Sequence, residues 1–387
     1  MTRLLQLSLV LIAVLQLSFC KLTSAQNLQL VWKYELGGEI IAAPVVLDDK
    51  VYIGSQNGIF CALDVDGKEL WRFETDGSIQ ASALIVDGKI FFESGNIFYL
   101  LTVASGKLIW QYDPQLEEEK YSHEGEQHRF KLDPFDDIRS KATYANGIIY
   151  IGGVDGTVFG LSIVDGRPVV KIASDDPAPI RSSPLIEENR LYYGDWAGVM
   201  YCNDVEEGSF LWSRKMFDFP QPYPTFGGIV SSFWIHDDLL FFGARNYTLN
   251  GVNKVTGELI WSYTDPEEGW IVGDPIVHND TLYIGGSDNF SLFSIEPNSG
   301  HIFWQAAGTK NIITKPLIIE EYIVYTEGNW YQPSDKGAVV LADRSNGKQL
   351  NRYYTKKAVF SSPASIGSGV VVGCHDGFIY NLSIDKL

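Results

Sequence analysis

The chain has 387 residues, with 48 acidic against 30 basic side chains and a formal charge of −18 at pH 7. Such a charge repels nucleic acid and anionic membrane surfaces, so neither is an expected partner. The four cysteines are too few and too scattered for a disulfide-rich scaffold, and Cys61, Cys202 and Cys374 are expected to pack as small apolar side chains.

Residues 1–25 have the pattern of a secretory signal peptide. Arg3 is the basic start, Leu4 to Leu17 is the apolar stretch, and small residues lead up to a cleavage site at the end of the segment. An alternative is a lipoprotein anchored through Cys20, although the bulky Phe19 stands where such sites need a small residue. No later stretch reaches the roughly 18 apolar residues of a membrane helix. The sequence predicts a secreted or periplasmic protein, soluble after cleavage, with no membrane span.

From residue 26 onward one sequence motif recurs with a period of about 45 residues, which is typical of a β-propeller or a solenoid. Its clearest copy, Val51 to Phe73, contains a β-branched strand ending in Gly, a second short strand, a tight turn and a last strand with a Trp. Most copies are preceded by a small or polar residue, a Pro and a further short strand, as at Ala43-Pro44. Short strands joined by glycine turns form antiparallel hairpins. Equivalent glycines before the last strand mark seven complete copies: Gly67, Gly106, Gly166, Gly208, Gly257, Gly300 and Gly347.

The eighth copy is incomplete. It begins at Ser361 and ends at Ile384 without the last strand, and a matching strand, Leu30 to Tyr34, stands at the other end of the chain. If this N-terminal strand completes the C-terminal blade, the ring closes and no open sheet edge remains. The sequence therefore predicts an all-β fold: an eight-bladed β-propeller of four-stranded antiparallel blades, closed by the N-terminal strand. It forms one domain over residues 26–387, expected as a monomer.

Large aromatic residues recur in the last strand of the copies. They are expected to lie between adjacent blades, because a ring of sheets needs apolar area there. The third copy has Val169-Val170 instead and the seventh has Asn351-Arg352-Tyr353, so these two junctions are predicted to be weaker. The tryptophans at equivalent positions are Trp32, Trp71, Trp110, Trp212, Trp261 and Trp304.

Three segments interrupt the repeat. Segment 113–139 is acidic, segment 214–228 is rich in Pro and aromatic residues, and segment 327–336 contains Trp330 and Tyr331. Long excursions from a rigid scaffold often carry binding functions. We expect other proteins to bind through these three loops; simple loop growth on one face is the alternative.

The sequence identifies no catalytic, cofactor-binding or metal-binding residue. His123 and His128 lie among acidic residues, but their spacing matches no zinc pattern. Asp155, Asp288 and Asp376 recur in equivalent turns, where side-chain bonds to the local backbone explain them. Four sequons for N-glycosylation are present, at Asn246, Asn279, Asn289 and Asn381.

The phrase Ala62-Leu63-Asp64, followed by Gly67-Lys68 and Trp71, resembles the repeat of the pyrroloquinoline-quinone-like propeller family, over essentially residues 28–387. Quinoprotein alcohol dehydrogenases of that family hold a quinone against a vicinal disulfide, beside a calcium ion and a basic Asp. This chain has no adjacent cysteines. It is more similar to the non-catalytic branch, the propeller subunit of the outer-membrane β-barrel assembly machinery. That resemblance implies a lipoprotein scaffold that presents loops to a partner and binds no cofactor.

Three functions are therefore expected as alternatives. The preferred one is an exported, non-enzymatic scaffold for protein–protein interaction. The second is a small alcohol dehydrogenase-like enzyme that uses pyrroloquinoline quinone with calcium. The third is a propeller that binds a carbohydrate or another small ligand through the aromatic residues at Phe217–Tyr223 and Trp330–Tyr331.

Overall fold

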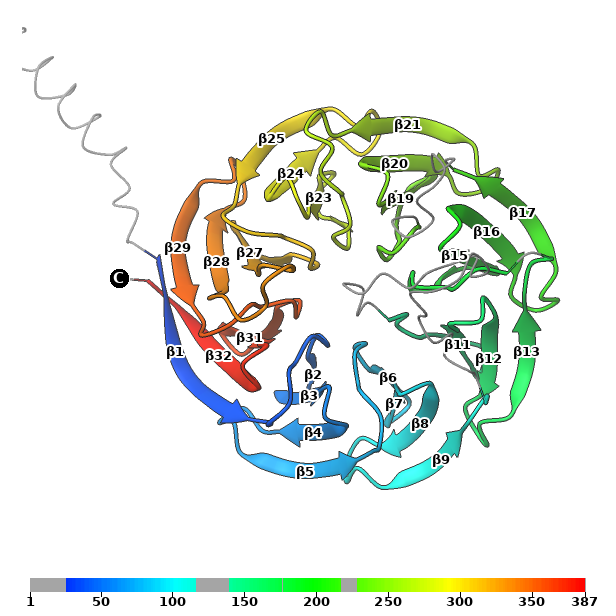
Figure 1. Cartoon of the computed structure of the whole chain (residues 1–387), viewed down its shortest axis with the longest axis horizontal. Coiled ribbons are helices and arrows are strands. Elements are labelled where there is room, and N and C mark those ends of the chain that lie inside the picture. Colours follow the sequence, from blue (N-terminus) through cyan, green and yellow to red (C-terminus); the bar gives the residue numbers. More distant parts are fainter. Residues whose placement is uncertain (1–25, 116–138, 176, 217–227, 387) are drawn as a thin grey trace, which may run out of the picture.

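The computed structural model describes residues 26–115, 139–175, 177–216 and 228–386; the predicted signal segment 1–25, with Cys20, lies outside them. Eight four-stranded antiparallel sheets stand around a central axis like the blades of a propeller (Figure 1). In the described ranges there is no helix that is long and apolar enough to cross a membrane. The predicted all-β, eight-bladed fold is confirmed.

Within each blade the strands follow one another from the axis outward (Figure 1). Blade 1 consists of β2 (Val45–Leu47), β3 (Lys50–Gly54), β4 (Ile59–Leu63) and β5 (Glu69–Glu74). Blade 2 consists of β6 (Leu84–Val86), β7 (Lys89–Ser94), β8 (Ile97–Thr102) and β9 (Leu108–Tyr112). Blade 3 consists of β10 (Thr143–Ala145), β11 (Ile148–Gly152), β12 (Val158–Ser162) and β13 (Pro168–Ile172). Blade 4 consists of β14 (Leu185–Glu187), β15 (Arg190–Gly194), β16 (Val199–Asp204) and β17 (Phe210–Lys215).

The second half of the ring repeats this arrangement. Blade 5 consists of β18 (Trp234–His236), β19 (Leu239–Gly243), β20 (Thr248–Asn253) and β21 (Leu259–Thr264). Blade 6 consists of β22 (Ile276–Val277), β23 (Leu282–Gly285), β24 (Ser291–Ile295) and β25 (Ile302–Ala307). Blade 7 consists of β26 (Leu317–Ile319), β27 (Tyr322–Glu327), β28 (Ala338–Asp343) and β29 (Gln349–Tyr354). Blade 8 consists of β30 (Ala364–Ile366), β31 (Gly369–Gly373), β32 (Phe378–Lys386) and β1 (Gln26–Glu35).

Blade 8 takes its outer strand from the other end of the chain. β1 pairs with β32 in antiparallel register, from Gln26 opposite Lys386 to Glu35 opposite Phe378. Figure 1 shows the blue β1 lying along the outside of the red β32. The predicted closure by the N-terminal strand is therefore confirmed.

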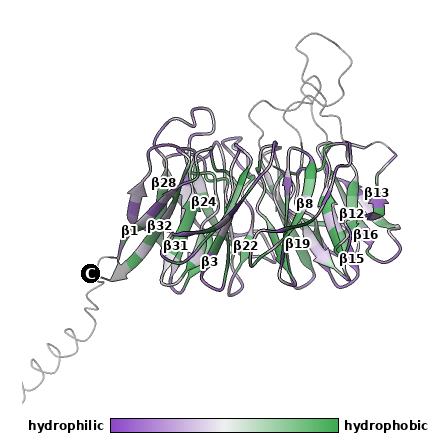
Figure 2. Ribbon diagram, turned by 90° about the horizontal axis from the view of Figure 1, so that it is seen from below, coloured by the Kyte–Doolittle hydropathy of each residue, from purple (hydrophilic) through white to green (hydrophobic). Residues whose placement is uncertain are grey.

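The hydrophobic core lies between neighbouring blades. Tyr52 and Phe60 of blade 1, for example, pack with Phe92 and Tyr99 of blade 2. The rings of Phe60 and Phe92 stack with their centroids 4.4 Å apart. Apolar residues are accordingly concentrated in the strands, and polar residues in the loops at both ends of the ring (Figure 2). Burial of this apolar surface is the main favourable contribution to the stability of the ring.

A tryptophan of one blade lies directly on the turn glycine of the next blade. Trp71 covers Gly106, where an added methyl group would come within 2.4 Å of the indole ring. The indole N–H of Trp71 donates to the carbonyl of Val103, 3.0 Å away. Gly106 has a φ of +64°, a conformation that favours glycine. The same contact joins Trp32 with Gly67, Trp110 with Gly166, Trp212 with Gly257, Trp261 with Gly300, and Trp304 with Gly347.

The predicted position of the tryptophans between blades is thus confirmed. At the junction from blade 3 to blade 4, Val170 takes the place of the tryptophan, and its nearest methyl lies 3.8 Å from a methyl built on Gly208. The hydroxyl of Tyr150 donates to the carbonyl of Val205 over 3.2 Å, as the indoles of Trp32, Trp71, Trp110 and Trp261 do to the equivalent carbonyls at their junctions. A different aromatic residue therefore supplies the hydrogen bond across this junction.

The junction from blade 7 to blade 8 lacks a tryptophan for a topological reason. The outer strand of blade 8 is β1, so no turn joins it to β32 and no turn glycine is present for an indole to cover. Asn351 instead accepts the backbone N–H of Leu28 over 3.2 Å and donates to Asn27 over 2.8 Å. The seam of the ring is therefore held by polar contacts as well as by the β1–β32 pairing.

All three predicted excursions start and finish at one end of the ring, which we call the loop face. This face carries the connections between blades and those between the second and third strands of each blade. The β9–β10 and β17–β18 connections are of the first kind, and segment 328–337 between β27 and β28 is of the second. Figure 2 shows segment 328–337 projecting beside β28. Residues 116–138 and 217–227 lie outside the described chain.

Replacing Gly106 with Ala tests the contact between blades. Both Gly106 and Gly88 have positive φ, of +64° and +69°, but a methyl on Gly88 meets nothing within 4 Å. Gly88→Ala should cost about 1–2 kcal/mol for the left-handed conformation alone. Gly106→Ala should cost about 1–3 kcal/mol more, because the methyl collides with Trp71. Urea unfolding of both variants measures the difference, and equal costs would show that the indole does not hold the junction.

Removing β1 tests the closure of the ring. A mature chain that lacks residues 26–35 loses the outer strand of blade 8, so its melting temperature should fall by on the order of 10 °C or more. A synthetic peptide of residues 26–35, added in excess, should restore much of the loss by mass action. Unchanged melting on deletion would contradict closure by this strand.

Candidate functional site

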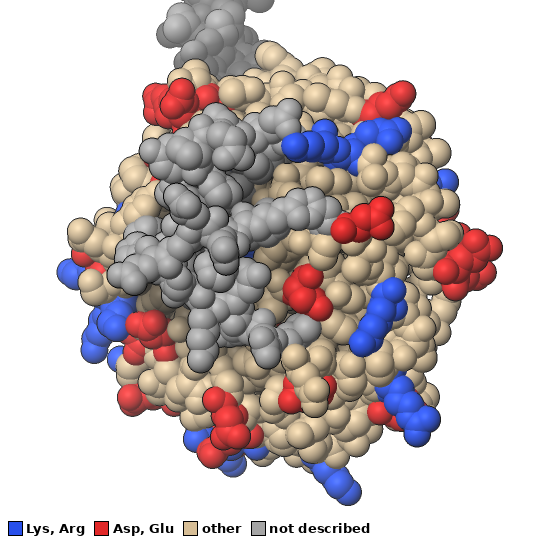
Figure 3. Space-filling view, turned by 45° about the vertical axis from the view of Figure 1, so that its right-hand side comes forward, with Lys and Arg blue, Asp and Glu red and all other residues tan. Residues whose placement is uncertain are grey.

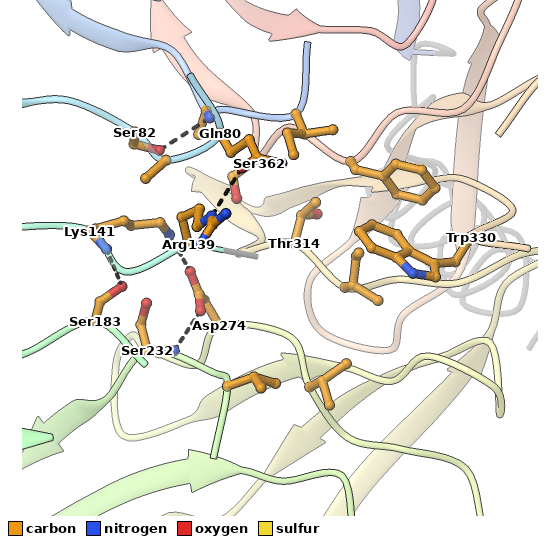
Figure 4. Close-up of a pocket in the computed structure, with 17 residues that line it drawn as sticks. Gln80, Ser82, Arg139, Lys141, Ser183, Ser232, Asp274, Thr314, Trp330 and Ser362 are labelled. Carbon is orange, nitrogen blue, oxygen red and sulfur yellow. Dashed lines mark hydrogen bonds and ion pairs between the residues drawn. The ribbon is translucent and has the colours of Figure 1, made fainter. Parts of the chain in front are cut away.

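A small pocket lies on the loop face, where the blades converge on the axis (Figure 4). Its volume is about 80 Å³. The residues that line it stand mostly just before the innermost strands, and one, Trp330, comes from the 328–337 segment. The short connections into the innermost strands therefore build the site, together with one excursion.

Two consecutive residues precede the innermost strand of each blade and have separate roles. In blades 4 and 5 the first residue holds its own blade together. The hydroxyl of Ser182 donates to the carbonyl of Gly194 over 2.7 Å and accepts its N–H over 2.8 Å. Ser231 makes the same pair of bonds with Gly243, both of 2.9 Å. These serines satisfy backbone groups at the end of the second strand, which would otherwise be buried without partners.

The second residue ties neighbouring blades to each other. In four places its backbone N–H donates to the side chain of the equivalent residue in the next blade. These bonds run from Ala43 to Ser82 (3.1 Å), from Lys141 to Ser183 (3.1 Å), from Ser232 to Asp274 (2.7 Å) and from Lys315 to Ser362 (3.0 Å). Together they join the eight blades in pairs around the mouth of the central channel.

Three charged residues interrupt this set of small side chains. Lys141 of blade 3 and Asp274 of blade 6 form an ion pair, with Nζ and Oδ2 separated by 2.5 Å. The two blades are not neighbours, so the ion pair crosses the mouth (Figure 4). The third charged residue is Lys315 of blade 7, whose Nζ lies 4.5 Å from the ring centre of Trp234.

The charges affect one another. Burial acts to raise the pKa of Asp274, but the nearby Lys141 and the hydrogen bonds from Ser232 outweigh it, so the pKa lies below its usual value. Burial lowers the pKa of Lys315, and Asp274 partly offsets this effect while Lys141 adds to it. The mouth thus holds an ionised carboxylate surrounded by a larger number of cationic and hydrogen-bond-donating groups.

The other side of the pocket is apolar. Trp330 packs edge to face on Phe360, with the ring centroids 4.5 Å apart. The backbone N–H of Trp330 donates to the side chain of Asn311 over 2.9 Å, which fixes the base of the excursion. Ile313 and Val230 complete this wall. The pocket therefore has one polar, charged wall and one aromatic, aliphatic wall.

Of the aromatic residues predicted to bind a ligand, the structure brings Trp330 to the pocket. Its neighbour Tyr331 is 52% exposed and donates its hydroxyl to Asp288 over 2.9 Å. The aromatic residues of Phe217–Tyr223 and the histidines His123 and His128 lie outside the described residues.

Other residues singled out in the sequence have structural roles. Asp155 accepts the N–H of Thr157 over 3.0 Å, and Asp376 accepts that of Phe378 over 3.1 Å, which confirms the predicted turn role. Asp288 differs, because its contact is with the excursion of blade 7. The three cysteines that the structure describes, Cys61, Cys202 and Cys374, are buried and free, as predicted. Among the four sequon asparagines, Asn279 alone is exposed.

Sequence reasoning missed Lys141, Asp274 and Lys315. The sequence contains a signal for them, because the residue two positions before the innermost strand can be compared between the eight copies. Five of the eight positions are Ala or Ser, and three are charged. A repeat needs small side chains there to close the mouth, so charges in single copies indicate a role beyond packing.

The described residues of this pocket do not fit a calcium-bound quinone. Calcium takes six to eight oxygen ligands, whereas the described lining offers one carboxylate, Asp274, which already pairs with Lys141. The described residues contain no group of three or more metal-binding side chains. The pocket volume of about 80 Å³ is also well below the roughly 300 Å³ at which cofactor sites begin.

The ion pair predicts a pH dependence of stability. At pH 7, Asp274→Asn should lower the free energy of unfolding by about 1–3 kcal/mol, because it leaves Lys141 without its partner. The folded-state pKa of Asp274 is lowered, so its contribution is present above about pH 4 and is lost as the pH falls below that value. Urea unfolding of wild type and variant at pH 7 and pH 3 measures this. Asp49→Asn, in an exposed turn, is the matched control, and a pH-independent difference would contradict the ion pair.

Comparison with known proteins places the chain in a family. Residues 21–129, 103–220 and 197–365 match the family described as outer membrane protein assembly factor BamB. A protein of that description from Shewanella oneidensis is 24% identical over 328 residues, which are 82% of this chain and 65% of that protein. The chain spans less than two thirds of the length of the curated relatives it matches.

Solved structures agree on the fold. BamB from Moraxella catarrhalis superposes with a TM-score of 0.68 at 17% identity, over 93% of this chain and 98% of that one. Quinohemoprotein alcohol dehydrogenase from Comamonas testosteroni superposes with a TM-score of 0.73 at 12% identity, over 93% of this chain and 77% of that one. At such identities these likenesses concern the fold alone. Because the family match extends over most of the sequence, the chain belongs to the family of the outer membrane protein assembly factor BamB, with PQQ-like β-propeller repeats.

Proposed function

We propose that this chain is an exported, non-enzymatic scaffold that assists the assembly of outer membrane proteins by binding partner proteins on its loop face. The observation that carries the proposal is the family match over residues 21–365. The rigid ring supports it, because it holds the starts of all three excursions at one face. The signal segment 1–25 supports a periplasmic location, with anchoring through Cys20 as the alternative. No cofactor is part of the proposal.

The described excursion of blade 7 is built to present side chains. Asn329 donates to Asp335 over 3.0 Å, and Lys310 donates to the carbonyl of Lys336 over 2.5 Å, so both ends of the loop are held. Tyr331 at its tip is 52% exposed. A rigid, exposed aromatic side chain loses little entropy on binding, and tyrosine is enriched at protein interfaces.

The charge distribution also favours a protein partner. On the face shown in Figure 3, acidic and basic side chains are interspersed, and no broad basic patch is visible. Binding of nucleic acid depends on such patches. Aromatic residues such as the exposed Tyr331 are enriched at protein interfaces.

Complementation in the source organism tests the function. Deletion of the gene should lower the amount of β-barrel proteins in the outer membrane, and the wild-type chain should restore it. Tyr331→Ala, or deletion of residues 117–137, should weaken the rescue. Val164→Ala is the matched control, because Val164 is 79% exposed but lies in a turn at the opposite end of the ring. Unchanged outer membrane composition without the gene would refute the proposal.

An assay for dye reduction separates the scaffold from the dehydrogenase alternative, which the shared fold with quinohemoprotein enzymes keeps open. The mature protein, mixed with pyrroloquinoline quinone, calcium and an alcohol, should reduce no dye above the rate of a protein-free control. Quinone-dependent turnover would favour the enzyme.

A further inference from the structure

The pocket at the mouth of the central channel offers more hydrogen-bond donors than acceptors. The side-chain oxygens of Ser82, Ser183 and Ser362 each accept a backbone N–H from the neighbouring blade. Their hydroxyl hydrogens make no bond within the described chain and can donate into the pocket. Among the described residues that line the pocket, Asp274 is the one carboxylate, and both of its oxygens already accept hydrogen bonds.

Positive charge is also in excess there. Lys141 uses one of its three N–H groups for Asp274 and retains two. Arg139 lines the same wall and donates through Nε to Gln80 over 3.0 Å. Lys315 does not line the pocket; its Nζ lies over Trp234, within electrostatic range of Asp274 and Lys141. The described lining therefore carries two cationic side chains and one carboxylate, in a chain whose net charge is −18. Charge-assisted hydrogen bonds to an anion are about twice as strong as neutral ones.

The opposite wall selects for an apolar group. Trp330 and Phe360 form an edge-to-face pair at this wall. Figure 4 shows Trp330 across the pocket from Lys141, Arg139 and Asp274. A ligand that spans the pocket must therefore carry negative charge at one end and an apolar body at the other. The volume of about 80 Å³ limits the enclosed part to a small group.

We propose that this pocket binds a carboxylate carried on a small apolar or aromatic body. The carboxylate accepts hydrogen bonds from Lys141 and the serine hydroxyls, and the body packs on Trp330. Two sources share this chemistry: a free organic acid, and the C-terminal residue of a polypeptide. The site does not depend on the proposed scaffold function, because its walls are formed by residues before the innermost strands and by Trp330, without any partner protein.

Titration calorimetry on the full mature protein tests the ligand class. Phenylacetate should bind, whereas phenylacetamide, which lacks the charge, and acetate, which lacks the ring, should each bind at least about tenfold more weakly, a free-energy difference of about 1.4 kcal/mol. A short peptide that ends in Phe with a free carboxylate, compared with its amidated form, distinguishes the two sources. Tighter binding of the peptide than of phenylacetate would assign the site to chain ends, and weaker binding to free acids. Equal affinity for phenylacetate and its amide, or no binding of either probe, would overturn the proposal.

Two variants, one in each wall, locate the binding. Lys141→Gln and Trp330→Ala should each weaken phenylacetate binding by about tenfold. Lys254→Gln is matched to the first, because Lys254 pairs with Glu187 over 2.8 Å in a turn away from the loop face. Tyr331→Ala is matched to the second, as the adjacent exposed aromatic residue.

Thermal unfolding checks that each variant is folded. Should Lys141→Gln unfold because Asp274 is left unpaired, Trp330→Ala, which removes no charge, still decides the result. Full affinity in folded variants of both walls would place the binding elsewhere and refute the proposal.

Discussion

The contact between the tryptophan of one blade and the turn glycine of the next sets the spacing of this ring. Six indoles lie so close to their glycines that a methyl group would collide with each ring. A flat indole against a bare backbone brings two twisted sheets together at a fixed distance and leaves the aromatic rings between them well packed. The same contact recurs at six of the eight junctions, and this regular spacing allows eight blades to close on β1.

Closure of the ring determines the chemistry at its centre. Because the blades are evenly spaced, equivalent residues before the innermost strands converge, and their serines can bond to the next blade. At most of these positions a small side chain is sufficient for the bond between blades. Lys141 and Asp274 also take part in such bonds, and their side chains add an ion pair across the mouth of the channel. A repeat fold can thus change the chemistry at its centre by changing one residue in a few copies, without altering a strand.

The loop face is the location of both proposed binding sites. The excursion of blade 7 leaves Tyr331 exposed, while its Trp330 lines the central pocket. Both residues belong to one loop, whose base is held by Asn311. The two proposals therefore share one excursion of the loop face.

The sequence by itself determined the repeat, the number of blades and the closure. Strand alternation, turn glycines and tryptophans are local signals, and they recur in most copies. It also accounted for the turn role of Asp155 and Asp376. The pocket was not predictable in the same way, since Lys141 and Asp274 are separated by more than a hundred residues and meet only when the ring closes. The role of Asn351 in place of a tryptophan likewise needed the tertiary structure, because its partners Leu28 and Asn27 belong to the strand from the other end of the chain. Local propensity fixes the strands, whereas the geometry of closure decides which distant side chains share the axis.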